Sequence, residues 1–348
     1  MANILTDRMK NILQTVIMQY IYTGEPVGSS VVSQKYMTDL SPATIRNTMS
    51  VMEDMGYLTQ PHASSGRVPT DQGLRFYVDS MLEIEELSQA ERKKIKTKYH
   101  ESQEIERIMS DTSIILSVFS NCMGIVIPPR LDNISIKYIE FIKLNKMQIM
   151  VLLVSNSGIV QNRMVRIEEE LTQHDLERMS GYLNEIAKGL TLGKLKAKII
   201  EKMKEEKTLY DQLLKKALDL SKIALDKEED TDSVYVEGKM NILNDPEFTK
   251  DVEKMKLLFR AFEEKSILVK ILDKALDTEA IKILIGSENR VNEIKGCSII
   301  TAPYTSNGNI LGTLGVIGPK RMNYSKVIPL VNYTASILSD IMAKREAV

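Results

Sequence analysis

Apolar residues in the first 55 positions recur every three or four residues, a spacing that predicts three short helices in succession. Ser29 can cap the second helix. Ser41 and Pro42 suit the N-cap and the first position of the third helix, and Gly56 suits its end. The four residues 38–41 separate these two helices, so the pattern predicts a helix-turn-helix. The apolar stripe of the third helix consists of Ile45, Met49 and Met52.

Two short strands are predicted next, at residues 57–61 and 67–69, around a tip of small residues. Three helices followed by a hairpin predict a winged helix. An Arg side chain can hydrogen-bond to guanine and an Asn side chain to adenine in the major groove. Ser and Thr side chains, and a hairpin that approaches closely, can contact the phosphates. Taken alone, the third helix is better explained as an ordinary amphipathic helix whose polar face meets water. The preceding helices and the following hairpin reverse that preference in favour of DNA binding. The candidate DNA-binding residues are Thr44, Arg46, Asn47 and Ser50 in the helix, and His62, Ser64, Ser65, Gly66 and Arg67 in the hairpin.

Beyond residue 70 the period of the pattern alternates between helix and strand. Helix is predicted to about residue 120, and helical spacing returns at 172–276 with an interruption at 234–243. A last helix is predicted at 325–344. Strands are predicted at 124–128, 134–144, 147–154, 159–167, 281–285, 298–304 and 310–317.

The two groups of strands, with a mostly helical stretch between them, predict an α+β protein whose antiparallel-sheet domain is interrupted by an insertion. Two separate domains are the alternative. The expected division is a winged-helix DNA-binding domain at 1–82, a helical connector at 83–120, a sheet domain formed by 121–191 and 279–348, and an inserted, mostly helical domain at 192–278.

Several runs of residues form a pattern that extends across nearly the whole chain. They are 43–47, 60–62, 65–67, 69–70 and 75–79 near the N-terminus, and 285–289 and 318–324 far along the chain. These runs and their order closely resemble the HrcA family, the heat-inducible transcription repressors of bacteria. Thr48 and Leu74 depart from the family pattern, the first near the expected DNA surface and the second in a packing position.

The resemblance implies a function and several partners. HrcA proteins repress chaperone operons by binding an inverted-repeat operator, the CIRCE element, as homodimers. Their activity depends on the GroEL chaperonin, which heat diverts to unfolded clients. The resemblance also implies that the sheet domain is GAF-like and that its insertion mediates dimerisation. By the same resemblance, the DNA-contacting positions are Thr44, Arg46 and Asn47, together with the hairpin tip 62–67.

Within the expected insertion, two apolar stripes are candidates for a dimer contact. Each lies on a helix rich in Lys and Glu, and the two stripes could instead simply cover each other. A dimer is favoured because one winged helix reads few base pairs, whereas two related by a twofold axis read a palindrome. The candidate dimer residues are Leu209, Leu213, Leu214, Leu218 and Phe262.

Charge and composition limit these interpretations. The net charge is −1, and the first 80 residues hold six Lys and Arg against seven Asp and Glu, so attraction to DNA depends on where the charges lie. No apolar run is long enough to cross a bilayer, and two cysteines are too few for a disulfide framework, which predicts a cytoplasmic protein without membrane contact.

The sequence contains no recognisable catalytic motif. The three histidines are far apart, no cysteine pair accompanies them, and no phosphate-binding loop or nucleophile elbow is present. We therefore expect neither an enzyme nor a protein that needs a metal or cofactor. Two alternatives stay open: a regulator whose GAF-like domain senses a small molecule near Glu288 and Asn289, and a winged helix that contacts only proteins.

Overall fold

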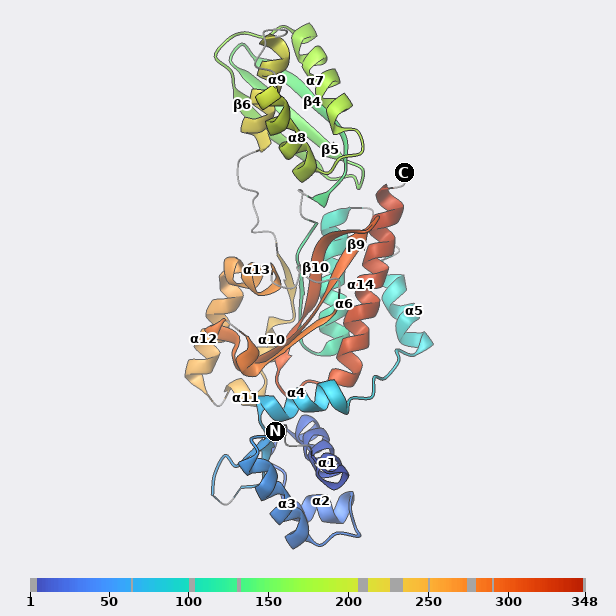
Figure 1. Cartoon of the computed structure of the whole chain (residues 1–348), viewed down its shortest axis with the longest axis vertical. Helices are drawn as coiled ribbons and strands as arrows, with labels where there is room; N and C mark the ends of the chain where they lie inside the picture. Colours follow the sequence, from blue (N-terminus) through green and yellow to red (C-terminus); the bar gives the residue numbers. More distant parts are fainter. Residues whose placement is uncertain are drawn as a thin grey trace.

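The computed structural model describes residues 5–63, 65–99, 104–129, 133–205, 212–225, 234–249, 251–273, 280–289 and 291–346. These residues form an elongated molecule of three units arranged along its long axis (Figure 1). An N-terminal helical unit lies at one end, a unit built around a five-stranded sheet occupies the middle, and a three-stranded sheet with its helices lies at the other end. The expected α+β class with antiparallel sheets is confirmed.

The N-terminal unit follows the order of elements that the sequence predicts. Hydroxyl side chains cap three of its helices: Thr6, Ser41 and Thr70 each accept a hydrogen bond from a backbone N–H in the first helical turn. The apolar stripes of the first three helices are buried against one another. The elements are α1 (Asp7–Thr23), α2 (Ser29–Lys35), α3 (Pro42–Asp54), β1 (Leu58–Thr59), β2 (Val68–Pro69) and α4 (Asp71–Ser80).

The central sheet has the strand order β7-β3-β10-β9-β8, with every neighbouring pair antiparallel. The turn between β9 and β10 falls at Asn307 and Gly308, which both adopt positive φ, as an Asn-Gly hairpin requires. The sheet brings together distant parts of the chain, because β3 pairs with β10. Its strands are β3 (Met123–Val126), β7 (Tyr235–Glu237), β8 (Lys282–Ile285), β9 (Cys297–Ser306) and β10 (Asn309–Pro319).

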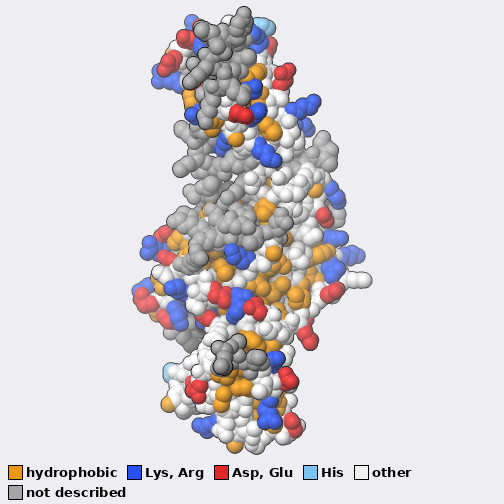
Figure 2. Space-filling model, in the orientation of Figure 1, with side chains coloured by type: hydrophobic (Ala, Val, Ile, Leu, Met, Phe, Trp, Pro, Cys, Tyr) orange, Lys and Arg blue, Asp and Glu red, His pale blue; other side chains and the backbone are white. Residues whose placement is uncertain are grey.

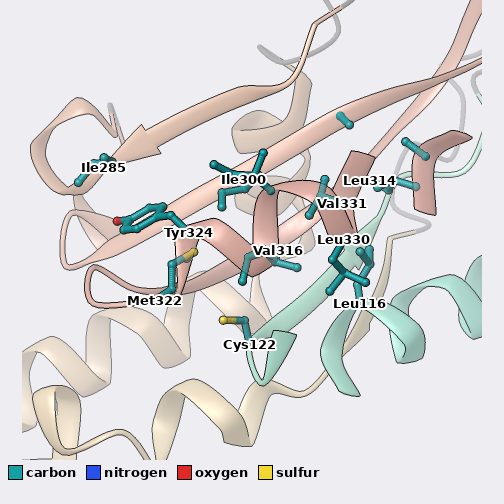
Figure 3. Packing of buried hydrophobic residues seen from close by; sticks show 14 of the residues in the cluster. Leu116, Cys122, Ile285, Ile300, Leu314, Val316, Met322, Tyr324, Leu330 and Val331 are labelled. Carbon is teal, nitrogen blue, oxygen red and sulfur yellow. The ribbon is translucent and has the colours of Figure 1, made fainter. Parts of the chain in front are cut away.

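Helices cover both faces of this sheet. On one face, Leu116 of α6 and Leu330 of α14 belong to the same apolar cluster as Leu314 and Val316 of β10 (Figure 3). On the other face, Ile317 joins a second cluster with residues of α10–α13. The covering helices are α6 (Ile105–Ser120), α10 (Lys239–Leu243), α11 (Pro246–Thr249), α12 (Val252–Glu263), α13 (Lys265–Asp273) and α14 (Tyr324–Glu346). None of the helices in the described ranges is long and apolar enough to cross a membrane.

The third unit has its own sheet, of order β4-β5-β6, with three helices over one face (Figure 1). Its core is separate from the cores of the central unit. Ser135, where the chain enters the unit, forms an isolated antiparallel bridge with Thr191, which lies between α7 and α8. Its elements are β4 (Ile136–Asn145), β5 (Gln148–Ser155), β6 (Val160–Arg166), α7 (Gln173–Ala187), α8 (Leu192–Glu205) and α9 (Gln212–Leu225).

The structure differs from the domain division expected from the sequence. The strands between 134 and 167 do not join the C-terminal strands in one sheet but pair only with one another. The helices between 239 and 273 cover the central sheet instead of belonging to the insertion. Local periodicity identifies a strand without revealing its partner, since pairing is decided by contacts far along the chain.

The expected connector at 83–120 also differs from the structure. Helix α6 is part of the central core, where Met109, Ile115 and Leu116 are buried. Only the first half of the stretch, including α5 (Gln89–Lys98), is largely exposed, with Ile95 as its buried anchor. The Lys and Glu residues before position 106 obscured the apolar helix that follows them.

Gly124 offers a test of how closely α6 packs on the sheet. A Cβ atom there would collide with the carbonyl oxygen of Ser113 and lie 2.8 Å from the amide nitrogen of Ser117, both backbone atoms of α6. We expect Gly124→Ala to lower the free energy of unfolding by about 1–3 kcal/mol, measured by urea denaturation.

Gly181 in α7 is the matched control, because a Cβ atom there would meet no atom within 4 Å. Gly181→Ala should raise the free energy of unfolding by about 0.5–1 kcal/mol, since it removes backbone freedom from the unfolded chain. Equal effects of the two substitutions would contradict the close packing of α6 on β3.

Candidate nucleic-acid interface

Helix α3 separates an apolar face from a polar face. Ser41 accepts a hydrogen bond from the backbone N–H of Thr44 at 3.1 Å, which fixes where the helix starts. Ile45, Met49 and Met52 are buried, and α3 packs through this face on α1 and α2. The opposite face is therefore directed away from the unit's own core.

The exposed face of α3 carries three of the four candidate residues. Arg46, Asn47 and Ser50 are exposed, and their side chains make no hydrogen bond or ion pair within the described part of the chain. Thr44 is half-buried and its hydroxyl lies 2.9 Å from the Ser41 hydroxyl, so it helps to close the helix start. The groups available to an external partner are therefore one guanidinium, one amide and one hydroxyl.

The loop of the β1–β2 hairpin is held by its own side chains. Gln60 donates from Nε2 to the carbonyl oxygens of Ala63 and Ser65, both at 2.9 Å. The Ser65 hydroxyl donates to the carbonyl of His62 at 2.8 Å and accepts from the His62 N–H at 3.1 Å. Of the candidates in this loop, His62 is exposed, Ser65 builds the turn, and Ser64 lies outside the described residues.

Gly66 allows the hairpin to cross the link between α1 and α2. The backbones of Val27 and Arg67 exchange two hydrogen bonds, at 2.8 and 2.9 Å. A Cβ atom on Gly66 would collide with the backbone of Val27. Close backbone approach therefore explains this glycine, which the sequence suggested as a DNA-contacting position.

Arg67 does not face outward as the sequence led us to expect. Its Nε lies 2.8 Å from Oε2 of Glu53, near the end of α3, and its side chain is only 16% exposed. The other carboxylate oxygen of Glu53 accepts the backbone N–H of Gln60 at 3.1 Å. Glu53 therefore links α3 to the hairpin both after β1, at Gln60, and before β2, at Arg67. The positive charge of Arg67 is balanced within the protein. We call these contacts of Glu53 the hairpin clamp.

Between α3 and the hairpin lies a hollow of about 220 Å³. Arg46 and Met49 line it from α3, and Gln60, Ser65 and Gly66 line it from the hairpin. The hollow is open and mostly polar, so a rigid, polar partner such as a nucleic-acid backbone could enter it beside Arg46.

Comparison with known proteins identifies the family. Residues 106–328 match the family model described as the HrcA protein C-terminal domain. The heat-inducible transcription repressor HrcA of Geobacter sulfurreducens is 45% identical over 339 residues, which cover 97% of this chain and 98% of the relative. The repressor HrcA of Syntrophobacter fumaroxidans is 41% identical over 97% of each chain. This chain belongs to the HrcA family.

A solved structure supports the fold as well. The crystal structure of a hypothetical protein covers 98% of this chain and 100% of that chain, with a TM-score of 0.64 and 23% sequence identity. The two proteins therefore share their overall fold. The match to the HrcA repressors extends over nearly the whole of this chain and of each relative.

Sequence reasoning missed two residues of the candidate interface, Glu53 and Gln60. Both contribute to the hairpin clamp. Gln60 lies within a run that carried the family resemblance, which was a usable signal. Glu53 has no comparable signal, because nothing in the sequence shows that a carboxylate at the end of α3 reaches an arginine of the hairpin.

Glu288 and Asn289, which the ligand-sensing alternative places at a small-molecule site, bind other groups of the same chain instead. Glu288 is ion-paired with Arg75 of α4. Asn289 is buried, and its amide donates to the carbonyl oxygens of Gly286 and Cys297 at 3.0 and 2.8 Å. These groups hold neighbouring segments of the HrcA chain together, which does not favour the ligand-sensing alternative.

Of the five expected dimer residues, the two whose side chains are described are buried within their own subunit. Leu218 is buried in the core of the third unit, and Phe262 is buried against the central sheet. The side chains of Leu213 and Leu214, and all of Leu209, lie outside the described residues. Leu218 and Phe262 thus lie in two separate apolar clusters of their own subunit, so these described residues do not cover each other, which was the alternative left open from the sequence.

The hairpin clamp can be tested without DNA. Arg67→Ala should destabilise the N-terminal unit by about 1–2 kcal/mol, because a half-buried Glu53 carboxylate then loses its charged partner. Amide hydrogen exchange of residues 58–69 should accelerate, while exchange in α1 changes little.

Lys10→Ala is the control, because the Lys10–Asp7 pair is exposed and its atoms are 3.7 Å apart. We expect that variant to leave hairpin exchange unchanged. If Arg67→Ala also leaves it unchanged, Arg67 does not hold the hairpin in place.

Proposed function

We propose that this chain is a sequence-specific DNA-binding repressor of chaperone operons that binds the inverted-repeat CIRCE operator as a homodimer, with its activity maintained by the GroEL chaperonin. Its N-terminal unit is the winged helix, and α3 is the recognition helix. The observation that carries the proposal is the free polar face of α3, where Arg46, Asn47 and Ser50 stand beside a clamped hairpin. The heat-inducible transcription repressors that resemble the chain over nearly its whole length support the repressor and heat-response parts of the proposal. The operator, homodimer and chaperonin parts rest on the family resemblance of the sequence.

The distribution of charge on the protein favours recognition of DNA through specific contacts with the bases rather than through general electrostatic attraction to the phosphates. On the face shown in Figure 2, acidic and basic side chains are interspersed. The hairpin's one arginine, Arg67, is balanced by Glu53. With few free cations near α3, non-specific affinity is expected to be low, and specificity comes from base contacts made by two copies at once.

The homodimer contact is proposed to lie on the face of the β4–β6 sheet that none of the described helices covers. The other face is buried by helices, whereas Val160 and Met164 on β6 are 59% and 76% exposed. The strand register aligns the outward residues in three cross-strand rows. The rows are Tyr138, Val154 and Val160; Glu140, Leu152 and Asn162; and Ile142, Met150 and Met164.

These rows suit a twofold contact. The two outer rows are apolar, and the middle row combines polar side chains with Leu152. A twofold axis through the middle row would place the apolar rows of one copy on those of the other, which is the self-complementarity that a symmetric dimer requires. A second copy of this chain is therefore the occupant that best fits the face.

Base reading by Arg46 can be tested directly. Arg46→Ala should weaken binding to an operator duplex by about 1–3 kcal/mol and relax base preference at one position in each half-site, because a bidentate contact to guanine is lost. Fluorescence anisotropy against a set of single-base operator variants measures both effects. A uniform loss across all the variants would assign Arg46 to phosphate contact instead.

Dimeric binding is tested with full-length protein on a palindromic duplex and on a single half-site, with and without chaperonin. Unmodified protein should bind the palindrome far more tightly than the half-site, and chaperonin should increase the active fraction. Met164→Glu should shift the protein to monomers in sedimentation velocity and remove the preference for the palindrome, because it places a charge in an apolar contact.

Val252→Glu is the matched control, since Val252 is 64% exposed on α12 and far from this sheet. It should leave the dimer intact. A dimer that survives Met164→Glu would rule out the β4–β6 face, and unmodified protein that ignores the palindrome would overturn the proposed function.

A further inference from the structure

Helix α4 connects the N-terminal unit to the central unit through two charged side chains. Asp71 and Arg75 lie one turn apart on α4, and both reach the segment 283–288 at the end of β8. In Figure 1, α4 lies between the helices of the N-terminal unit and the central sheet. Any change at these contacts therefore alters how α3 is held relative to the rest of the protein.

The guanidinium of Arg75 makes a forked contact. Its Nε lies 2.8 Å from Oε1 of Glu288, and a terminal nitrogen contacts the other carboxylate oxygen. The same nitrogen donates to the carbonyl of Ile283 at 2.8 Å. Because both carboxylate oxygens of Glu288 contact the planar guanidinium of Arg75, the interaction fixes the relative orientation of the two groups as well as their separation.

The carboxylate of Asp71 is held on both oxygens. One accepts the backbone N–H of Ser287 at 2.8 Å, and the other accepts from Nζ of Lys320 at 2.8 Å. Gly286 makes room for it: φ is +52°, and a Cβ atom there would collide with the carboxylate. The turn is thus shaped to receive this side chain.

The receiving turn is itself rigid. Glu288 accepts the backbone N–H of Ile285 at 2.8 Å while it binds Arg75. The amide of Asn289 holds the turn from behind through its bonds to Gly286 and Cys297. Burial acts to raise the pKa of Asp71 and of Glu288, but hydrogen bonds from their partners hold both pKa values below the ordinary range, so both groups stay charged near neutral pH.

Apolar contacts continue beneath these ion pairs. Leu74 and Tyr77 of α4 belong to the same cluster as Ile285 and Tyr324 of the central unit (Figure 3). Loss of an ion pair would therefore loosen the connection without detaching α4. The three runs 75–79, 285–289 and 318–324, which are far apart in the sequence, meet at this place.

We propose that the contacts of Asp71 and Arg75 with Ser287, Glu288, Ile283 and Lys320, here called the α4 joint, fix the angle of the N-terminal unit so that two α3 helices in a dimer keep the one separation that an inverted repeat requires. The inference rests on the proposed operator binding. Asp71, Arg75, Glu288 and Lys320 are positioning residues, which act on DNA only through the placement of α3.

The α4 joint matters because dimeric binding depends on geometry. When one half-site is bound, a rigid connection concentrates the second α3 helix at its own half-site. A loose connection spreads that helix over many positions, which lowers affinity for the correct spacing and makes other spacings more acceptable.

The test uses full-length dimers and two variants, Arg75→Ala and Lys320→Ala, which remove one cation from opposite sides of the joint. Arg260→Ala is the matched control: it removes one cation from the exposed Arg260–Glu264 pair of α12. Binding is measured on a half-site, on the palindrome, and on palindromes whose centre is longer or shorter by about half a helical turn.

We expect unmodified protein and Arg260→Ala to show a sharp spacing optimum. Arg75→Ala and Lys320→Ala should lose on the order of tenfold affinity at that optimum and bind the altered spacings almost as well, with unchanged half-site affinity. Arg75→Lys should recover part of the optimum. An unchanged spacing profile, or tighter binding at every spacing, would overturn the inference.

A measurement without DNA separates failure of the joint from failure of the proposed function. Spin labels on Val51→Cys in α3, a 48% exposed position outside the candidate DNA-binding residues, and on Lys94→Cys in α5 report the angle between the units. The native Cys122 and Cys297 are buried. Labelled chains diluted with unlabelled ones should give a narrow distance distribution, which Arg75→Ala and Lys320→Ala broaden. Equal widths would overturn the joint, whereas a narrow distribution in protein that binds no inverted repeat would overturn only the function.

Discussion

The carboxylate of Glu53 receives the guanidinium of Arg67 and the backbone N–H of Gln60, and these contacts decide what the N-terminal unit can offer to DNA. They place the hairpin firmly beside α3. They also neutralise the hairpin's one arginine within the protein. Because little free positive charge remains near α3, recognition has to come from well-placed base contacts and not from broad attraction to phosphates.

A protein that makes few contacts with DNA must hold its contacting residues in fixed positions. Several parts of the structure do this. The hairpin clamp fixes the surface around α3, and the ion pairs of α4 fix that surface on the central sheet. Helices on both faces stiffen the sheet itself. The exposed apolar side chains Val160 and Met164 of β6, at the far end, mark the face proposed for contact with a second copy. Each contact is short-range, but together they can relate two α3 helices over the length of the molecule.

The local elements could be read from the sequence, because caps, stripes and turn residues encode them locally. Ser41 and the Ile45 stripe located α3, and Asn307–Gly308 located the β9–β10 turn. Long-range partners were not encoded in this way. The pairing of β3 with β10, the separation of β4–β6 from that sheet, and the ion pair of Arg67 with Glu53 all depend on residues brought together only by folding. For this reason the exposure of the polar face of α3 follows from the sequence pattern, whereas the close backbone contact of Gly66 and the ion pair of Arg67 do not. Contact of these residues with DNA stays a prediction.

The most direct measurement is a structure of the full-length dimer bound to an inverted-repeat duplex. The account predicts one α3 helix in the major groove of each half-site, with Arg46 at a base edge and Arg67 still paired with Glu53. A complex in which α3 lies away from the groove, or in which Arg67 leaves Glu53 to contact the bases, would contradict it.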